Sequence, residues 1–297
     1  MAFNARHFSS LHTHTLFDDG RDDIESMCKA AFEKGLCAIG FSSHAPIEKA
    51  GFTTTWNMKE NRMAEYAKEV KAAGRRWEGK IAVYLGFEVD YIKGLRSVLD
   101  GDIQDIKPDY LISSVHYILS SGKKPFTIDG SVIEIENGIT EGFNGSGEAM
   151  MHAYWDAVIE MTSLGGFDIV GHLDLVKKGN LRNPSKRFFD MENNSIYMQR
   201  AGEAVQAIAA GGFLVEINTG MINRNYFSET CPSLPILRLL KQYNVPIIIS
   251  ADAHNAGDID GNYQLACKTL LQAGYNSHFL FTGRNSAGKA LWQEQEI

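Results

Sequence analysis

The chain has 297 residues, a hydrophobic fraction of 44%, a charged fraction of 22% and a formal net charge of −7. This composition is typical of a globular protein and excludes extensive disorder, and the acidic balance disfavours a broad nucleic-acid interface. The amino-terminal segment lacks the apolar core of a signal peptide, and no apolar run is long enough to span a membrane. The four cysteines form no CxxC pair, so we expect neither a disulfide framework nor a thiolate zinc site, and the expected location is the cytoplasm.

Short apolar runs rich in β-branched and aromatic residues alternate with longer stretches of helical periodicity. The expected strands, in chain order, are Phe8–Leu11, Ala38–Ser42, Ile81–Phe87, Tyr110–Val115, Ile169–Gly171, Phe213–Ile217, Pro246–Ser250 and Phe279–Phe281. The expected helices are Ile24–Glu33, Lys59–Trp77, Glu148–Leu164, Glu192–Ala210, Leu234–Gln242, Gln264–Ala273 and Ala287–Gln295. This alternation predicts βα units around a parallel sheet. The number of units favours a single closed barrel over residues 1–297, with an open doubly wound sheet as the alternative.

Residues 120–147 interrupt this alternation. The segment is rich in glycine and serine and contains two short β-like runs, Phe126–Ile128 and Val132–Ile135. We interpret it as a loop with a small hairpin, inserted into the same domain. Long loops in compact domains often cover or line a binding site.

Ligand-type side chains recur where the expected strands end. Six histidines each follow an apolar run: His12, His14, His44, His116, His172 and His254. Glu88 and Asp252 follow apolar runs in the same way. Active sites of (β/α) barrels lie at the carboxyl ends of the strands, so we expect these side chains to converge there. A lone histidine in such a position is more often a hydrogen-bonded core residue, but six of them favour a site.

Two pairs of these residues share a spacing of two. His12 and His14 form one pair, and Asp252 and His254 form the other near the opposite end of the chain. On a strand this spacing directs both side chains to one face, and closure of a barrel would bring the first and last strands together. Asp19 follows the first pair in a glycine-containing turn, where it is either a further ligand or only a turn or capping residue.

These side chains are more numerous than one catalytic zinc needs, which is about three protein ligands and a water. With Glu88 bridging two cations, the set suits two or three divalent metal ions. The mixture of imidazoles and carboxylates favours Zn, Fe or Mn over Ca or Mg. Cations about 3.5–4 Å apart can deprotonate a bridging water and stabilise an in-line displacement at phosphorus.

The order of these motifs resembles the PHP (polymerase and histidinol phosphatase) superfamily. The shared pattern is HxH, a turn aspartate, a strand-end histidine, GxE, SxH, GHxD and DAH, and it runs from His12 to His254. The resemblance implies an α/β fold, a distorted TIM-like (β/α)7 barrel, with a trinuclear metal centre. One departure is Ser43, where many members have an aspartate, but that position is not among the implied ligands.

The resemblance also implies which residues hold each metal. It assigns His12, His14, Glu88 and Asp252 to one ion, Glu88, His116 and His172 to a second, and Asp19, His44 and His254 to a third. Glu88 would therefore bridge the first two ions.

Within the superfamily the chain is most similar to the monofunctional histidinol-phosphate phosphatases. The segments that carry this similarity include HAP after His44, GFEVDYI, GHLDLVKK, EINTG and CPS. The similarity implies hydrolysis of L-histidinol phosphate to L-histidinol and phosphate, in histidine biosynthesis. In the implied reaction a metal-bridging hydroxide attacks phosphorus, and Glu88 and Asp252 serve as catalytic carboxylates.

Cationic side chains near the expected site are candidates to bind the phosphate group. They are Arg224, Arg182 and Lys177. The alternative for each is a solvated surface cation. Asp174 either orients His172 or assists the leaving group, or simply begins a helix. Trp56 and the Phe126–Gly130 loop are candidates to contact the imidazole and amine of the substrate, with packing as the alternative.

Three other functions remain open. A PHP phosphoesterase could act on another small phosphate ester or a nucleotide. A metal-dependent amidohydrolase also uses HxH and a late aspartate, but it would leave Asp19, His44 and His254 unexplained. A non-catalytic protein with a decayed metal site is disfavoured by the complete ligand set. The expected partner is a small phosphate ester, without nucleic acid or membrane, and the oligomeric state is not predicted.

Overall fold

A sheet of parallel strands forms the frame of the protein. The computed structural model describes residues 7–120, 122, 124–192 and 195–297. Within these ranges the main sheet has seven strands in the order β1-β2-β3-β4-β7-β8-β9, and all neighbours are parallel. The strands are β1 (Ser9–Ser10), β2 (Ala38–Phe41), β3 (Ala82–Asp90), β4 (Tyr110–Ser114), β7 (Ile169–Val170), β8 (Leu214–Asn218) and β9 (Ile247–Ser250).

The two outer strands of this sheet meet and nearly close it into a barrel. Just after β1, the backbone N–H of His14 donates to the carbonyl of Ala253 at 2.9 Å. Just after β9, the N–H of Ala253 donates to the carbonyl of His12 at 3.1 Å. The first and last strands therefore lie side by side, which confirms the expected distorted (β/α)7 barrel and excludes the open doubly wound sheet.

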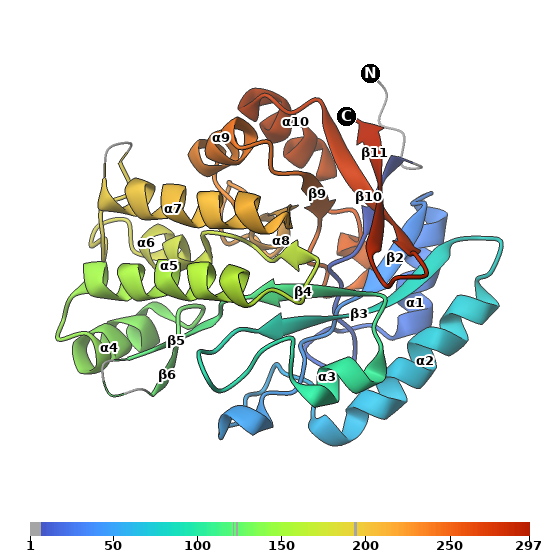
Figure 1. Cartoon of the computed structure of the whole chain (residues 1–297), viewed down its shortest axis with the longest axis horizontal. Coiled ribbons are helices and arrows are strands. Elements are labelled where there is room, and N and C mark those ends of the chain that lie inside the picture. The colour runs from blue at the N-terminus through green and yellow to red at the C-terminus, as the bar shows by residue number, and fades with distance from the viewer. Residues whose placement is uncertain (1–6, 121, 123, 193–194) are drawn as a thin grey trace.

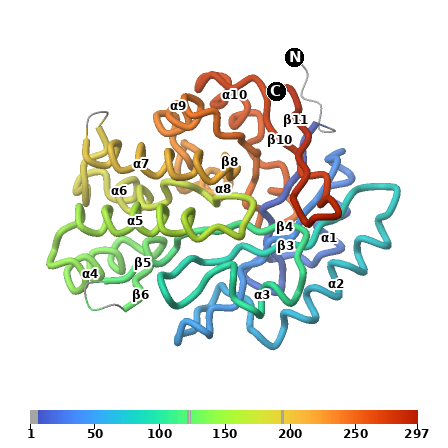
Figure 2. Tube along the Cα trace, viewed as in Figure 1, coloured from blue at the N-terminus to red at the C-terminus, as the bar shows by residue number. Residues whose placement is uncertain are grey.

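Helices in the connections between strands pack around the outside of the barrel (Figure 1). They are α1 (Ile24–Glu33), α2 (Met63–Arg76), α3 (Gly101–Ile106), α4 (Val132–Gly142), α5 (Gly147–Leu164), α6 (Lys178–Arg182), α7 (Ile196–Gly211), α8 (Gly220–Asn223), α9 (Leu234–Gln242) and α10 (Tyr263–Ala273). Asp23, Ser146 and Ser195 cap α1, α5 and α7, each accepting a hydrogen bond from a backbone N–H three residues later. The helices α5 and α7 lie side by side (Figure 2). None of the helices in the described ranges has the length and apolarity to cross a membrane.

The insertion at residues 120–147 contains a short strand and a helix; its residues 121 and 123 lie outside the described ranges. β6 (Pro125–Thr127) pairs antiparallel with β5 (Tyr117–Leu119). The second β-like run that we expected, Val132–Ile135, is wrong, because it forms the first turn of α4. Ser131 and Glu134 form a capping box, in which each side chain accepts a bond from the backbone N–H of the other, and this arrangement starts a helix.

The carboxyl-terminal segment is a β-hairpin that packs against the barrel. The helix that we expected at Ala287–Gln295 is wrong, because β11 (Ala290–Glu296) pairs antiparallel with β10 (Ser277–Arg284). The side chain of Asn285 accepts hydrogen bonds from two backbone N–H groups of the connecting turn, which favours a turn over a helix start. Phe281 of β10 joins a buried cluster formed by side chains from the barrel strands.

Tyr110, the first residue of β4, occupies the interior of the barrel. Its ring is buried, and its hydroxyl donates to the carbonyl of Leu11. A Cβ atom added at Gly40 or Gly86 would lie 2.5 Å from an atom of Tyr110. Glycine is therefore needed at these positions of β2 and β3 to leave room for the ring.

His278 of β10 has a perturbed pKa. Its ring is buried and stacks on Phe8, with the ring centroids 4.9 Å apart. Burial lowers the pKa of His278 to about 4, below the value of about 6.5 expected in the unfolded chain. The unfolded chain therefore takes up this proton first as the pH falls.

The stability contributed by neutral His278 is full above about pH 6.5 and is lost as the pH falls toward about 4. We expect His278→Phe to reduce, by about 2 kcal/mol, the loss in unfolding free energy between about pH 7 and pH 5. Chemical denaturation of both proteins at the two pH values measures this difference. Equal losses in the two proteins would show that His278 does not titrate in this way.

Candidate metal centre at the carboxyl ends of the strands

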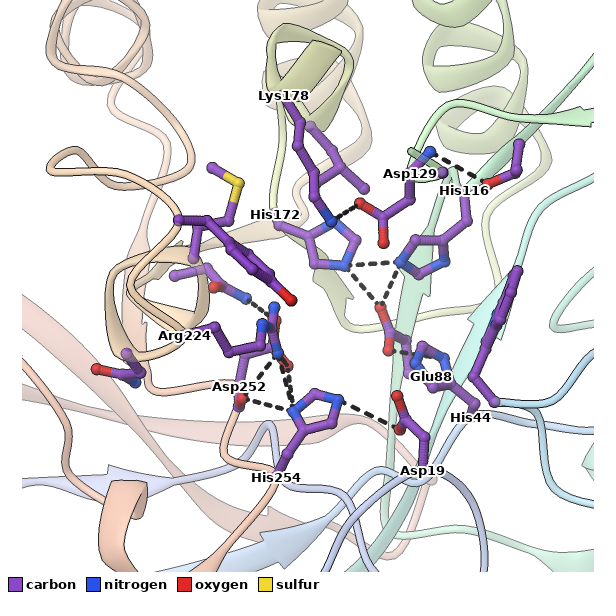
Figure 3. A pocket seen from close by; sticks show the side chains of 18 of the residues that line it. Asp19, His44, Glu88, His116, Asp129, His172, Lys178, Arg224, Asp252 and His254 are labelled. Carbon is purple, nitrogen blue, oxygen red and sulfur yellow. Dashed lines mark hydrogen bonds and ion pairs between the residues drawn. The ribbon is translucent and has the colours of Figure 1, made fainter. Parts of the chain in front are cut away.

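The carboxyl ends of the parallel strands open onto a cavity of about 630 Å³. Glu88 lies near the end of β3, His116 follows β4, His172 follows β7 and Asp252 follows β9, and all four line the cavity (Figure 3). Residues far apart in the chain meet here because parallel strands end at the same edge of the barrel.

The structure brings all nine predicted metal ligands together. In the described ranges, four overlapping groups each place one ligand-type atom per residue within 4.8 Å of one another. The groups are His14, Asp19, His44 and His254; His12, His14 and Asp252; His12, Glu88 and His172; and His44, Glu88 and His116. Four residues, His12, His14, His44 and Glu88, each belong to two of the groups, so the groups form one continuous cluster.

Glu88 lies at the centre of the cluster and is 1% exposed. Its Oε1 accepts a hydrogen bond from Ser114 Oγ at 2.6 Å and lies 2.8 Å from Nε2 of His172. Its Oε2 lies 3.1 Å from Nε2 of His12 and 3.1 Å from Nδ1 of His44. Burial alone would raise the pKa of Glu88, but the surrounding imidazoles lower it well below its ordinary value. The carboxylate is therefore ionised.

Several ligand-type atoms of this cluster are buried without a hydrogen-bond partner among the described residues. They are Nε2 of His12, Nε2 of His14, Nδ1 of His44 and Oε2 of Glu88. Each unpartnered polar atom costs free energy, and the three ring nitrogens approach the same carboxylate oxygen. Divalent cations would satisfy these atoms, and the mixture of imidazoles and carboxylates suits Zn, Fe or Mn. The residues present therefore fit bound metal ions.

Three carboxylates that we did not predict from the sequence contact histidine rings on the side that faces away from the cluster. They are Asp18 on His14 (2.6 Å), Glu216 on His12 (2.9 Å) and Asp90 on His116 (2.8 Å), each distance joining a carboxylate oxygen to Nδ1. This contact leaves Nε2 of each ring facing the cluster. Burial would lower the pKa values of His14 and His116, but Asp18 raises the pKa of His14 to about 10 and Asp90 raises that of His116 to about 9.

Asp18 also explains how the cluster accommodates Ser43. The hydroxyl of Ser43 donates to Asp18 Oδ1 at 2.8 Å, and the backbone N–H of His44 donates to Oδ2 at 2.8 Å. One carboxylate thus connects the segments after β1 and β2.

The sequence contained a signal that could have predicted the contact of Asp90 with the cluster, since Asp90 lies two residues after Glu88 and therefore on the same face of the strand.

Arg224 and Arg182 line the cavity, as expected of residues that bind a phosphate. The Nη1 and Nη2 atoms of Arg224 donate to the two carboxylate oxygens of Asp252 at 3.2 and 3.1 Å. Arg182 donates to the carbonyl of Gly130 at 2.8 Å, and its guanidinium lies 4.7 Å from the ring centroid of Tyr226.

We expected Lys177 to bind phosphate, and Asp174 to orient His172, assist the leaving group or begin a helix, but neither residue is among those that line the cavity. Both are buried, and Lys177 Nζ lies 3.1 Å from Asp174 Oδ2. Lys177 also donates to the carbonyl of Thr230 at 2.6 Å, and Asp174 accepts from the backbone N–H of Ser233 at 2.9 Å. The pair joins the turn after β7 to the segment before α9, and no described bond links Asp174 to the ring of His172.

The neighbouring Lys178, which the sequence did not single out, takes the cavity position instead. It forms an ion pair with Asp129 of the insertion (Figure 3). Trp56 also lines the cavity and stacks on Tyr117, with the centroids 6.1 Å apart. Of the Phe126–Gly130 loop, Thr127, Asp129 and Gly130 reach the cavity.

Known proteins are similar to this chain in sequence. The chain is 26% identical over 264 residues to a Deinococcus radiodurans protein named a probable histidinol-phosphatase, covering 89% of this chain and 92% of that one. It is 26% identical over 266 residues to the histidinol-phosphatase of Bacillus subtilis, covering 85% of this chain and 96% of that one.

A solved structure shows the same fold. The histidinol phosphate phosphatase of Lactococcus lactis, complexed with Zn, L-histidinol and phosphate, aligns with a TM-score of 0.65 and 20% identity, covering 96% of this chain and 99% of that one. The PHP domain family model matches residues 10–220, which include most of the barrel strands and most of the clustered ligands. This chain therefore belongs to the PHP domain family.

Proposed function

We propose that this protein is a metal-dependent phosphomonoesterase that hydrolyses L-histidinol phosphate to L-histidinol and phosphate, a step of histidine biosynthesis. The observation that carries the proposal is the convergence of imidazoles and carboxylates on buried Glu88, in a cavity that also holds Arg182 and Arg224. The names of the relatives support the substrate, and so do the ligands of the Lactococcus lactis structure.

We assign the ligands to a trinuclear centre, with two or three sites filled in the active protein. As the family resemblance implies, the first site consists of His12, His14, Glu88 and Asp252, the second of Glu88, His116 and His172, and the third of Asp19, His44 and His254. The groups found in the structure divide the same nine residues differently, since they place His14 with the third set and His12 with Glu88 and His172. When bound, divalent cations supply an activated water and a counter-charge for the phosphoryl oxygens. The two oxygens of Glu88 face different imidazoles, His172 at 2.8 Å and His12 at 3.1 Å, which supports its role as the bridge.

Cationic side chains bind the phosphate group of the substrate. Arg224 anchors on Asp252 and directs its planar guanidinium into the cavity, where it can donate to phosphoryl oxygens. Arg182 and Lys178 add positive charge on the side of the insertion. Their charges, with those of bound cations, explain how a chain of net charge −7 holds an anionic ester.

We propose a single domain over residues 1–297, in which the insertion forms part of the cavity wall through Asp129 and Gly130. We place the protein in the cytoplasm, because its four cysteines are free thiols, as a reducing compartment keeps them.

Substrate selectivity and metal dependence test the proposal directly. We expect kcat/KM for L-histidinol phosphate to exceed that for a mononucleotide or p-nitrophenyl phosphate by about 100-fold or more, because the cavity wall contacts the rest of the substrate. Chelation should abolish turnover, and Zn, Mn or Fe should restore it. Equal turnover of all phosphomonoesters would overturn the substrate, and amide hydrolysis without phosphatase activity would overturn the reaction class.

His14→Ala tests the assignment of the ligands. Removing this imidazole should lower kcat by at least about 100-fold and reduce the bound metal, because His14 contributes to two of the ligand groups. Circular dichroism should remain that of a folded protein. His152→Ala, which alters a surface histidine on α5, is the matched control and should retain full activity. Persisting activity of His14→Ala with unchanged metal content would show that His14 is not a ligand.

Arg224→Lys and Lys177→Met separate substrate binding from structural support. Arg224→Lys should raise KM about tenfold, because lysine cannot keep the bidentate contact with Asp252 and also donate to a phosphoryl oxygen. Lys177→Met should leave KM unchanged and lower the unfolding free energy by about 3 kcal/mol, because it leaves Asp174 buried without its partner. Steady-state kinetics and chemical denaturation measure the two effects, and the reverse pattern would contradict both assignments.

A further inference from the structure

Strand β8 differs from the other described strands of the barrel, because its end supplies none of the predicted metal ligands. Its two polar side chains, Glu216 and Asn218, are 0% and 2% exposed. They lie two residues apart and therefore project to the same side of the strand. Neither side chain belongs to the ligand groups, yet both contact residues that do.

Glu216 accepts hydrogen bonds from the strands on both sides of it. Its Oε2 lies 2.9 Å from Nδ1 of His12 and accepts from Ser250 Oγ at 2.5 Å. Its Oε1 accepts from the backbone N–H of His172 at 2.7 Å and from Nδ2 of Asn218 at 2.9 Å. This one carboxylate therefore connects β1, β7, β8 and β9 at the level of the cluster.

These contacts determine which nitrogen of His12 faces the ligands. An ionised carboxylate only accepts hydrogen bonds, so Nδ1 of His12 carries a hydrogen and donates it to Glu216. Nε2 of His12 then faces Glu88 Oε2 at 3.1 Å, and it is one of the buried ring nitrogens without a hydrogen-bond partner among the described residues. The tautomer and orientation of the ring therefore follow from Glu216.

Asn218 extends the same network to a third ligand. Its Nδ2 lies 2.9 Å from Glu216 Oε1 and 3.3 Å from Asp252 Oδ2. Its Oδ1 accepts from the backbone N–H of Gly220 at 2.8 Å. A Cβ atom at Gly220 would lie 2.6 Å from Asp252 Oδ2, so the glycine leaves room for this carboxylate.

We propose that Glu216 is a positioning residue for the metal centre: it holds His12 with Nδ1 protonated and Nε2 free, and it fixes the backbone that carries His172. β8 thus contributes the support of the cluster, where the other strands contribute ligands. The inference rests on the metal dependence in the proposed function and is independent of the substrate.

Glu216→Gln tests this role, because glutamine has the same size but replaces one accepting oxygen by an N–H donor. The probe is Zn²⁺ alone, titrated against a chromophoric chelator. We expect the affinity of one bound ion to fall about 10–100-fold. ¹⁵N-histidine NMR of the zinc-loaded protein should show loss of the Nδ1–H, Nε2-coordinated pattern of one ring. Glu216→Asp, which keeps the charge, should recover part of the affinity.

Ser250→Ala is the matched control, because it removes one donor to Glu216 and leaves the contact with His12 intact. Its zinc affinity should stay within about threefold of the parent protein. A Glu216→Gln protein that is only less stable, with unchanged zinc affinity and an unchanged NMR pattern, would reduce Glu216 to a structural cross-link and overturn the inference. Failure of both Glu216 variants to fold, with Ser250→Ala folded, would overturn it too.

His12→Asn separates this inference from the proposed function. If His12→Asn binds as much Zn²⁺ as the parent protein and as tightly, then His12 is not a ligand and the proposed metal centre fails. If His12→Asn loses an ion but Glu216→Gln does not, the metal centre stands and only the role of Glu216 is overturned.

Discussion

The charge of Glu88 must be compensated inside the protein. A carboxylate that is 1% exposed cannot be hydrated, and an unpaired buried charge costs several kcal/mol. The surrounding strand ends meet this constraint by directing imidazoles toward the two oxygens of Glu88. The barrel closes between the first and last strands, so His12 and Asp252 join the same cluster although they lie at opposite ends of the chain.

Carboxylates outside the predicted ligand set add further negative charge around the imidazoles of the cluster. Asp18, Asp90 and Glu216 each bind a ring that already approaches Glu88 or Asp252. Burial would lower the pKa of His14, but Asp18 raises it to about 10, so this ring holds its proton more strongly than a free imidazole does. Cation binding then competes with protons for Nε2, and metal affinity must fall as the pH falls. The carboxylates that contact Nδ1 of these rings make the imidazoles stronger metal ligands, and they make metal binding depend on pH.

The sequence predicted the features that depend on local patterning. Parallel strands show as apolar runs, and a ligand after each run falls at the carboxyl edge of the sheet, so the clustering of His12, His116 and His172 follows from their position alone. We predicted the wrong secondary structure at two places where a few side-chain hydrogen bonds decide it. The capping box of Ser131 and Glu134 makes a helix of a β-branched run, and the turn at Asn285 makes a strand of a polar segment.

Positions around a helical turn and long-range contacts were harder to predict. Lys177 and Lys178 are adjacent in sequence, but a helix-like backbone places successive side chains about 100° apart, so one pairs with Asp174 and the other reaches the cavity. The contact between Glu216 and His12 spans 204 residues and exists only once the barrel has formed. No local pattern around Glu216 indicates that it supports a metal ligand.

The barrel backbone packs closely around the predicted ligands. A Cβ atom at Gly171, just before His172, would lie 2.1 Å from Ser114 Oγ, the hydroxyl that donates to Glu88. Asp252 has a φ of 49°, a left-handed conformation that few non-glycine residues adopt and that costs about 1 kcal/mol or more. The surrounding contacts must offset this strain, and Arg224 supplies two of them. The backbone therefore holds Asp252 in a conformation selected for its place in the cluster rather than for its intrinsic stability.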